Sequence, residues 1–146
     1  MRVLLDTNVL ARAASGPPGM ANELVLEATR PAHALLLSPF VVQELSRVLR
    51  YDRLRPIHGL DEAGMDQYVA DLVRACEMVF PIGSSEVVAD DPDDDPIVAA
   101  ALAGNADVLC TRDRHLLRES VVAYCQQEGV TILNDAATLA VLRQTP

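Results

Sequence analysis

Two acidic side chains stand where short apolar segments end. Asp6 follows residues 2–5 (RVLL), and Asp113 comes soon after residues 107–111 (DVLCT). In an open parallel sheet, ligands bind beyond the carboxyl ends of the strands, so both side chains would lie at one edge. Each aspartate is also explained by an Asx turn or by capping of the next helix. The sequence therefore leaves a functional and a local structural interpretation open for both.

Glu44 occupies the apolar side of a predicted helix. It lies three residues after Val41 and four before Val48, and these spacings place all three on one helical face. A carboxylate directed into a protein interior costs several kcal/mol unless it is paired, protonated or bound to a metal. Surface solvation does not explain Glu44, whereas a metal site does. A buried ion pair with Arg2 or Arg112 is the structural alternative.

An aspartate-rich segment, residues 89–96 (ADDPDDDP), opens an Ala-rich helix. Asp95 followed by Pro96 is favourable for an N-cap and a first helical position. Capping by Asp95 is compatible with metal binding by the same side chain. Asp94 is the alternative ligand, and the other aspartates of this segment are expected to form a solvated loop.

Acidic side chains that converge require a positive charge. Two carboxylates about 4 Å apart repel by about 1 kcal/mol in water and about 4 kcal/mol at an effective dielectric near 20. Oxygen ligands favour Mg²⁺ or Mn²⁺, whereas zinc prefers His or Cys. The three histidines are scattered and fit no ligand spacing. The predicted cofactor is therefore Mg²⁺ or Mn²⁺.

The elements that position these acids alternate between strand and helix. Short apolar segments predict strands at residues 2–5, 34–37, 78–82, 107–111 and 130–133. Helical patterns cover residues 20–29, 38–50, 61–76, an Ala-rich stretch ending at Gly104–Asn105, 114–127 and 135–143. Strands that are apolar on both faces and alternate with helices indicate a parallel sheet between helical layers. We expect a single α/β domain over residues 1–146.

The overall charge argues against an ordinary nucleic-acid-binding protein. The chain carries 21 acidic and 12 basic residues, a formal net charge of −9, and nucleic-acid binders are usually basic. Some of this carboxylate excess is explained if acids gather around a cation. The odd number of cysteines, three, and the absence of a signal peptide or an apolar run of about 18 residues favour the reducing cytoplasm and no membrane contact.

The acidic motifs, in their order, resemble the PIN-domain nucleases. The similarity is to the bacterial PIN-family toxin components of toxin–antitoxin systems, the VapC-like toxins. It rests on LLDTNVL, SPFVVQELSRVL and DPDDDPIVAAALAGNADVLCTRDRHLL, within about residues 2–117. The resemblance implies a PIN-like three-layer α/β/α sandwich with a central, mainly parallel five-stranded sheet. It places the family's metal-binding and catalytic acids on Asp6, Glu44, Asp95 (or Asp94) and Asp113, and the supporting polar residues on Asn8, Thr111 and Thr7.

The resemblance also implies an activity and its partners. The expected enzyme is a Mg²⁺- or Mn²⁺-dependent endoribonuclease, a hydrolase in which metal-activated water cleaves RNA phosphodiester bonds. It would be the toxin of a toxin–antitoxin pair, with a cognate antitoxin protein and frequent homodimers. Arginines near the predicted acids are candidates for RNA binding, although the same residues could instead offset helix dipoles: Arg47, Arg50, Arg53 and Arg112.

Two other functions fit parts of the sequence. A catalytically silent PIN-like protein would bind RNA or a protein partner without cleaving it, but all four acids are present. A Mg²⁺-dependent small-molecule phosphatase also carries an aspartate after its first strand. That chemistry needs a second aspartate two residues later, where this chain has Asn8.

Overall fold

A five-stranded sheet forms the centre of the molecule. The computed structural model describes residues 1–14, 18–82 and 95–146, and for Asp95 only the backbone. The strand order is β3-β2-β1-β4-β5, and every neighbouring pair is parallel. The strands are β1 (Arg2–Leu5), β2 (Ala34–Leu37), β3 (Glu77–Met78), β4 (Val108–Cys110) and β5 (Thr131–Leu133). The carboxyl ends of all five therefore point toward the same edge.

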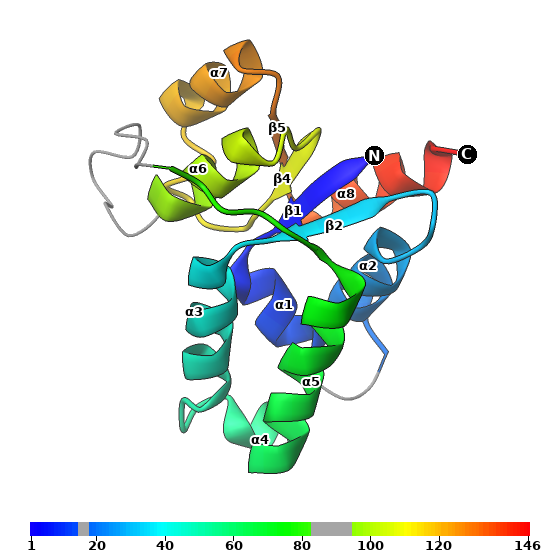
Figure 1. The fold of residues 1–146 in the computed structure, drawn as a ribbon, viewed down its shortest axis with the longest axis vertical. Coiled ribbons are helices and arrows are strands. Elements are labelled where there is room, and N and C mark those ends of the chain that lie inside the picture. The colour runs from blue at the N-terminus through cyan, green and yellow to red at the C-terminus, as the bar shows by residue number, and fades with distance from the viewer. Residues whose placement is uncertain (15–17, 83–94) are drawn as a thin grey trace.

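Helices cover both faces of this sheet (Figure 1). One layer holds α1, α2, α3, α5 and α8, in which α1 packs against α2 and α3, and α2 against α8. The other holds α6 and α7. The helices of the described residues are α1 (Thr7–Ala13), α2 (Met20–Ala28), α3 (Pro39–Leu49), α4 (Arg55–His58), α5 (Glu62–Ala75), α6 (Asp95–Ala103), α7 (Glu119–Gln127) and α8 (Asp135–Gln144). The predicted α/β fold with helices on both sides of a parallel sheet is confirmed.

Buried aliphatic side chains hold the layers together. Leu4, Leu36 and Leu109, in the three central strands, are each 0% exposed. Such full burial is expected for strands covered on both faces. No helix of the described residues is long and apolar enough to cross a membrane.

Two predicted helix boundaries are confirmed by their capping interactions. Ser38 caps α3, because its hydroxyl accepts a 3.3 Å hydrogen bond from the backbone N–H of Val41. Asn105 ends α6 in the left-handed conformation, with φ of 47°, as is common after a helix. Gly104 lies against β2, since a Cβ there would come within 2.8 Å of Leu36 Cδ1.

Other boundaries differ from the prediction. β3 contains only Glu77–Met78 rather than residues 78–82, and the side chains of Phe80 and Ile82 are exposed. α7 begins at Glu119, so the start predicted at residue 114 was wrong, and residues 114–117 form turns. The short helices α1 and α4 lie in segments for which no helix was predicted.

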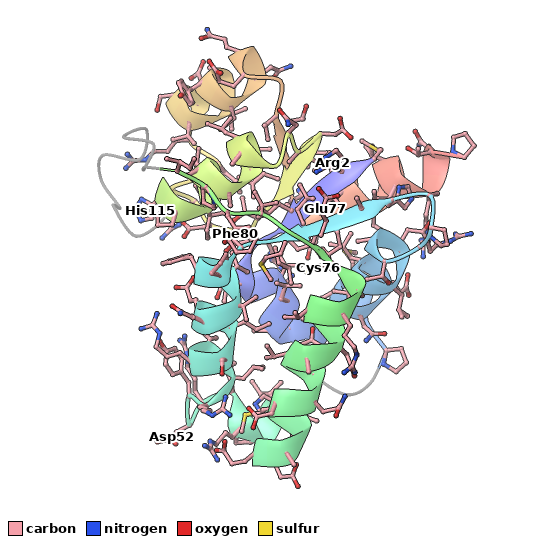
Figure 2. All side chains as sticks on the ribbon, viewed as in Figure 1. Arg2, Asp52, Cys76, Glu77, Phe80 and His115 are labelled. Atoms are coloured by element: carbon pink, nitrogen blue, oxygen red, sulfur yellow. The ribbon has the colours of Figure 1, made fainter. Side chains whose placement is uncertain are left out.

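An ion pair formed by Arg2, at the start of β1, spans three strands. Arg2 donates from Nη2 and Nη1 to the two carboxylate oxygens of Glu77, at 2.7 and 3.0 Å. The two side chains lie together in Figure 2. Because β2 lies between β1 and β3, this pair ties both neighbours of that strand together. Arg2 is thereby committed to Glu77 and does not pair with Glu44.

Candidate functional site

Asp6 is fixed at the carboxyl end of β1. Its backbone N–H donates to the carbonyl of Cys110 at the end of β4, at 2.9 Å, and its own carbonyl accepts from Val9 and Leu10 in α1. Asp6 occupies the N-cap position of α1, yet its side chain makes no capping hydrogen bond. The residue is 3% exposed. Helix capping therefore does not explain this buried carboxylate.

Thr111 joins Asp6 to Asp113. The hydroxyl of Thr111 donates to Oδ2 of Asp6 at 2.7 Å and accepts from the backbone N–H of Asp113 at 3.0 Å. Thr111 is completely buried, and its backbone N–H donates to the carbonyl of Leu133 in β5. One threonine thus connects the ends of β1, β4 and β5.

Asp113 makes an Asx turn, the local structural role that the sequence left open beside a functional one. Its Oδ1 accepts a 2.9 Å hydrogen bond from the backbone N–H of His115. The residue is half-buried. The turn holds the carboxylate near Asp6 and is compatible with a second role for its other oxygen.

Glu44 approaches the same edge from α3. Its Oε2 accepts a 2.9 Å hydrogen bond from the hydroxyl of Thr7, the residue that follows Asp6. Its side chain is 23% exposed, and its Oε1 lies 3.4 Å from Nη2 of Arg47. Glu44 is therefore half-buried at the margin of the apolar face. The alternative of a buried ion pair with Arg2 or Arg112 does not hold, because these arginines contact Glu77 and Asp135.

The electrostatic environment of Asp6 favours a cation. The pKa of Asp6 is raised to about 6, mainly because burial removes solvation from its charged form. Hydrogen bonds from Thr111 and from the Thr7 backbone act to lower the pKa, while the negative charges of Asp113 and Glu44 raise it further. Among the described residues, the charged groups that act on Asp6 are thus carboxylates. Divalent cations suit such oxygen donors, and their charge would offset the repulsion.

Asp113 and Glu44 lie close enough to Asp6 to raise its pKa, but these three acids, whose side chains are described, do not form a closed metal cage. Among the described residues, no three His, Cys, Asp or Glu side chains form a group that could hold a metal ion. Asp94 and the Asp95 side chain lie outside the described residues. The backbone of Asp95 begins α6, which packs against α3 and β4. Thr7 and Thr111 bond to the acids, whereas Asn8 is exposed in the first turn of α1.

The four predicted RNA-binding arginines have different surroundings. Arg50 is held by Glu62 and Asp66 of α5, with nitrogen–oxygen distances of 2.9 and 2.8 Å. Arg53 lies over the ring of Tyr51, 5.6 Å from its centroid. Arg47 lines a hollow of about 290 Å³ with Phe40, Gln43 and Glu44. Arg112 lies near Asp135, at the end of β5.

A pair of residues beside the site was not predicted. Arg12 of α1 donates from Nη2 to Oδ2 of Asp135, at 2.7 Å, and Asp135 is buried. Asp135 begins α8 two residues after β5, much as Asp6 follows β1. This position after a strand was the available signal. Its partner Arg12 is 123 residues away, and no sequence signal indicated that the two would pair.

A family model for the PIN domain matches residues 2–115 of the chain. The chain belongs to the PIN domain family. PIN domains are generally nucleases, and these nucleases generally use divalent metal ions. The matched residues of this PIN domain include Asp6, Glu44 and Asp113, but end before Asp135. No curated protein and no solved structure matches the chain significantly.

Proposed function

We propose that this PIN domain is a Mg²⁺- or Mn²⁺-dependent endoribonuclease. Asp6, Glu44, Asp113 and Asp95 would hold the metal, with Asp94 as the alternative to Asp95. The observation that carries the proposal is the environment of Asp6, a buried carboxylate with two further carboxylates acting on it. A purely structural role would favour a cationic partner for such a group. Here the nearby charges increase the need for a bound cation.

Divalent metal fits these residues because every donor is an oxygen. A bound metal ion would supply an activated water and would neutralise charge that develops on the phosphodiester. Removal of the metal should therefore abolish cleavage. It should not unfold the protein, because the layers are joined by the aliphatic core.

The threonines orient the acids for this role. Thr111 holds Oδ2 of Asp6 by a hydrogen bond and so helps to orient the carboxylate. Thr7 fixes Oε2 of Glu44 in the same way, and its backbone joins it directly to Asp6. Groups that hold ligating carboxylates by hydrogen bonds strongly affect metal affinity in proteins. Thr7 and Thr111 are thus positioning residues.

RNA would approach an acidic protein through local positive and aromatic groups. The hollow on α3 presents the guanidinium of Arg47 and the ring of Phe40 beside Glu44. Guanidinium groups contact phosphates, and aromatic rings stack on unpaired bases. This surface suits a single strand whose bases are accessible. Arg53 and Arg112 are further candidates for phosphate contact.

The biological setting of the proposed enzyme follows from its resemblance to PIN-family toxins. We infer a cytoplasmic toxin of one domain over residues 1–146, held inactive by a cognate antitoxin and able to form homodimers. Genetic linkage tests this role separately from catalysis. A short neighbouring reading frame whose product binds and inhibits the purified chain would support it.

A cleavage assay separates the proposed function from its rivals. Mixed cellular RNA and a small phosphate monoester are each incubated with the protein and EDTA, Mg²⁺ or Mn²⁺. The proposal predicts RNA fragments with 5′-phosphate ends in Mg²⁺ or Mn²⁺, none in EDTA, and no phosphate release from the monoester. RNA binding without cleavage would favour a silent PIN domain. Monoester hydrolysis alone would favour a phosphatase.

A further inference from the structure

We propose that a hollow formed by Arg12, Arg112 and Asp135 binds a backbone phosphate of the RNA strand, beside the bond that is cleaved. This inference rests on the proposed nuclease function and adds a subsite to it. The hollow has a volume of about 450 Å³. Pockets of this size accommodate small ligands or parts of a polymer.

The order of the strands places this hollow next to the acids. β1, β4 and β5 are adjacent and parallel. Asp6 follows β1, Arg112 follows β4, and Asp135 follows β5, so all three lie at the same edge. Arg112 is also the residue between Thr111, which bonds to Asp6, and Asp113. A strand of RNA that reaches the acids therefore passes close to Arg112.

The two arginines share a single carboxylate oxygen. Nη2 of Arg12 lies 2.7 Å from Oδ2 of Asp135, and Nη1 of Arg112 lies 3.7 Å from the same atom. Burial acts to raise the pKa of Asp135, but the hydrogen bonds from Arg12 and the Ala136 backbone, with both positive charges, lower it. The carboxylate therefore stays ionised near neutral pH. Two positive charges and one negative leave this cluster net positive on an acidic chain.

A structural ion pair alone does not require both arginines. The contact between Arg12 and Asp135 already joins α1 to α8. Arg112 is 58% exposed and lies beyond hydrogen-bonding distance of the carboxylate, so it adds little to the fold. Its guanidinium lies near that of Arg12, since both approach the same oxygen of Asp135. The N–H donors of each guanidinium are fixed in one plane. Such paired guanidinium groups are suited to phosphate.

Two helices begin at the rim of the hollow. Gly19, Met20 and Ala21, at the start of α2, line it together with Ala136 in the first turn of α8. No side-chain cap is formed at the N-cap residue Gly19. Backbone N–H groups in the first turn of a helix lack intrahelical partners and attract anions. In α8 the N–H groups of Ala136 and Ala137 already donate to Oδ1 of Asp135 and of Asn134, so the N-terminus of α2 is the helix end that adds to the guanidinium charges and favours a phosphate over a neutral ligand.

The test measures RNA affinity in the presence of Ca²⁺ at several salt concentrations. A fluorescein-labelled single-stranded RNA of mixed sequence is titrated with wild-type protein, Arg12→Gln and Arg112→Gln, and binding is followed by anisotropy. We expect each variant to weaken binding by about 3- to 10-fold and to reduce the slope of log affinity against log salt by about 0.7. Arg143→Gln is the matched control, because Arg143 also forms an ion pair, with Glu23, at the far end of α8. It should bind like the wild type.

The outcomes distinguish this inference from the proposed function. Wild-type affinity and salt slope in both variants would overturn the phosphate subsite, even if metal-dependent cleavage by the wild type is observed. Absence of cleavage by the wild type would instead refute the nuclease proposal, whereas weaker RNA binding in both variants would still support the subsite. If Arg12→Gln lowers the melting temperature, Arg112→Gln alone decides, because Arg112 is exposed and makes no hydrogen bond to the described part of the chain beyond its 3.7 Å contact with Asp135.

Discussion

The hydroxyl of Thr111 donates a 2.7 Å hydrogen bond to Oδ2 of Asp6, across 105 residues of sequence. The same oxygen of Thr111 accepts the backbone N–H of Asp113. One buried side chain thus holds two of the acids proposed to bind metal. The parallel pairing of β1 with β4 brings these residues together.

Replacement of Thr111 tests this positioning role. Thr111→Val keeps the shape of the side chain but removes the hydroxyl, so Asp6 loses one of the bonds that stabilise its charged form. We expect cleavage to fall by about 10- to 100-fold and the metal concentration for half-maximal activity to rise. Thr111→Ser retains the hydroxyl and should keep most of the activity. Equal loss in both variants would indicate a packing role instead.

The raised pKa of Asp6 makes the stability of the metal-free protein depend on pH. Its folded-state pKa of about 6 lies above the ordinary value of 3.8. Below about pH 4 the carboxyl is protonated in both the folded and the unfolded protein, so its burial does not lower the free energy of unfolding. As the pH rises through 6, folding comes to require burial of a charge, and stability falls by about 3 kcal/mol.

Asp6→Asn isolates this contribution. The variant cannot ionise, so in EDTA it should become more stable than the wild type by about 3 kcal/mol as the pH rises from 4 to 8. Urea unfolding at each pH measures the difference. Asp52→Asn, at an exposed position (Figure 2), controls for loss of one negative charge. A difference that does not vary with pH would contradict the buried environment assigned to Asp6.

Substitutions of Arg47, in α3, and of Arg50, at the C-terminus of that helix, should show which arginine binds RNA and which supports the fold. Arg47 lines the hollow beside Glu44, whereas Arg50 is taken up by Glu62 and Asp66. We expect Arg47→Gln to weaken RNA binding by about threefold or more. Arg50→Gln should bind RNA like the wild type, with at most a small drop in melting temperature. The opposite ranking would assign the RNA contact to Arg50, which the sequence indicates as a candidate together with Arg47.

His58 has a structural role, and its contribution to the free energy of unfolding can be measured. Its Nε2 lies 2.7 Å from the carbonyl of Leu49, and its Nδ1 accepts from the backbone N–H of Leu60 at 2.9 Å. His58→Ala leaves both backbone groups without these partners and should cost about 2–3 kcal/mol in urea unfolding. Ile57→Ala, at the exposed neighbouring position, should change stability by only about 0.5 kcal/mol. Similar values for the two variants would show that the histidine bonds contribute little.

The features of the fold that the sequence predicted are those set by interactions between residues close together in the chain. The apolar strands and the Ser38 cap depend on neighbouring residues, so their signals are contained in short segments. α1 was missed because Asp-Thr-Asn resembles a turn, whereas its helical state is stabilised by packing against α2 and α3. β3 proved short because the chain leaves β2 after Val79, whose buried side chain and N–H bond to Leu37 are the last contacts with that strand, and the side chains of Phe80 and Ile82 are exposed.

The sequence proposes the acids of the candidate site but not the contacts that hold them. Asp6 and Asp113 were recognised from their positions after strands, and Glu44 from its place on a helical face. The pairing of Thr111 with Asp6 depends on the register of β1 and β4, which no local pattern encodes. The ion pair of Arg12 with Asp135 likewise requires the packing of α1 near the start of α8.

Binding of Mn²⁺ tests the central claim most directly, because it does not depend on the choice of RNA. Free Mn²⁺ is measured by electron paramagnetic resonance as wild-type protein and Asp6→Asn are titrated, with circular dichroism to verify the fold of each. We predict saturable binding by the wild type and affinity at least about tenfold weaker in the variant. Equal binding by the two folded proteins, or no binding by the wild type at millimolar Mn²⁺, would contradict a metal site built around Asp6.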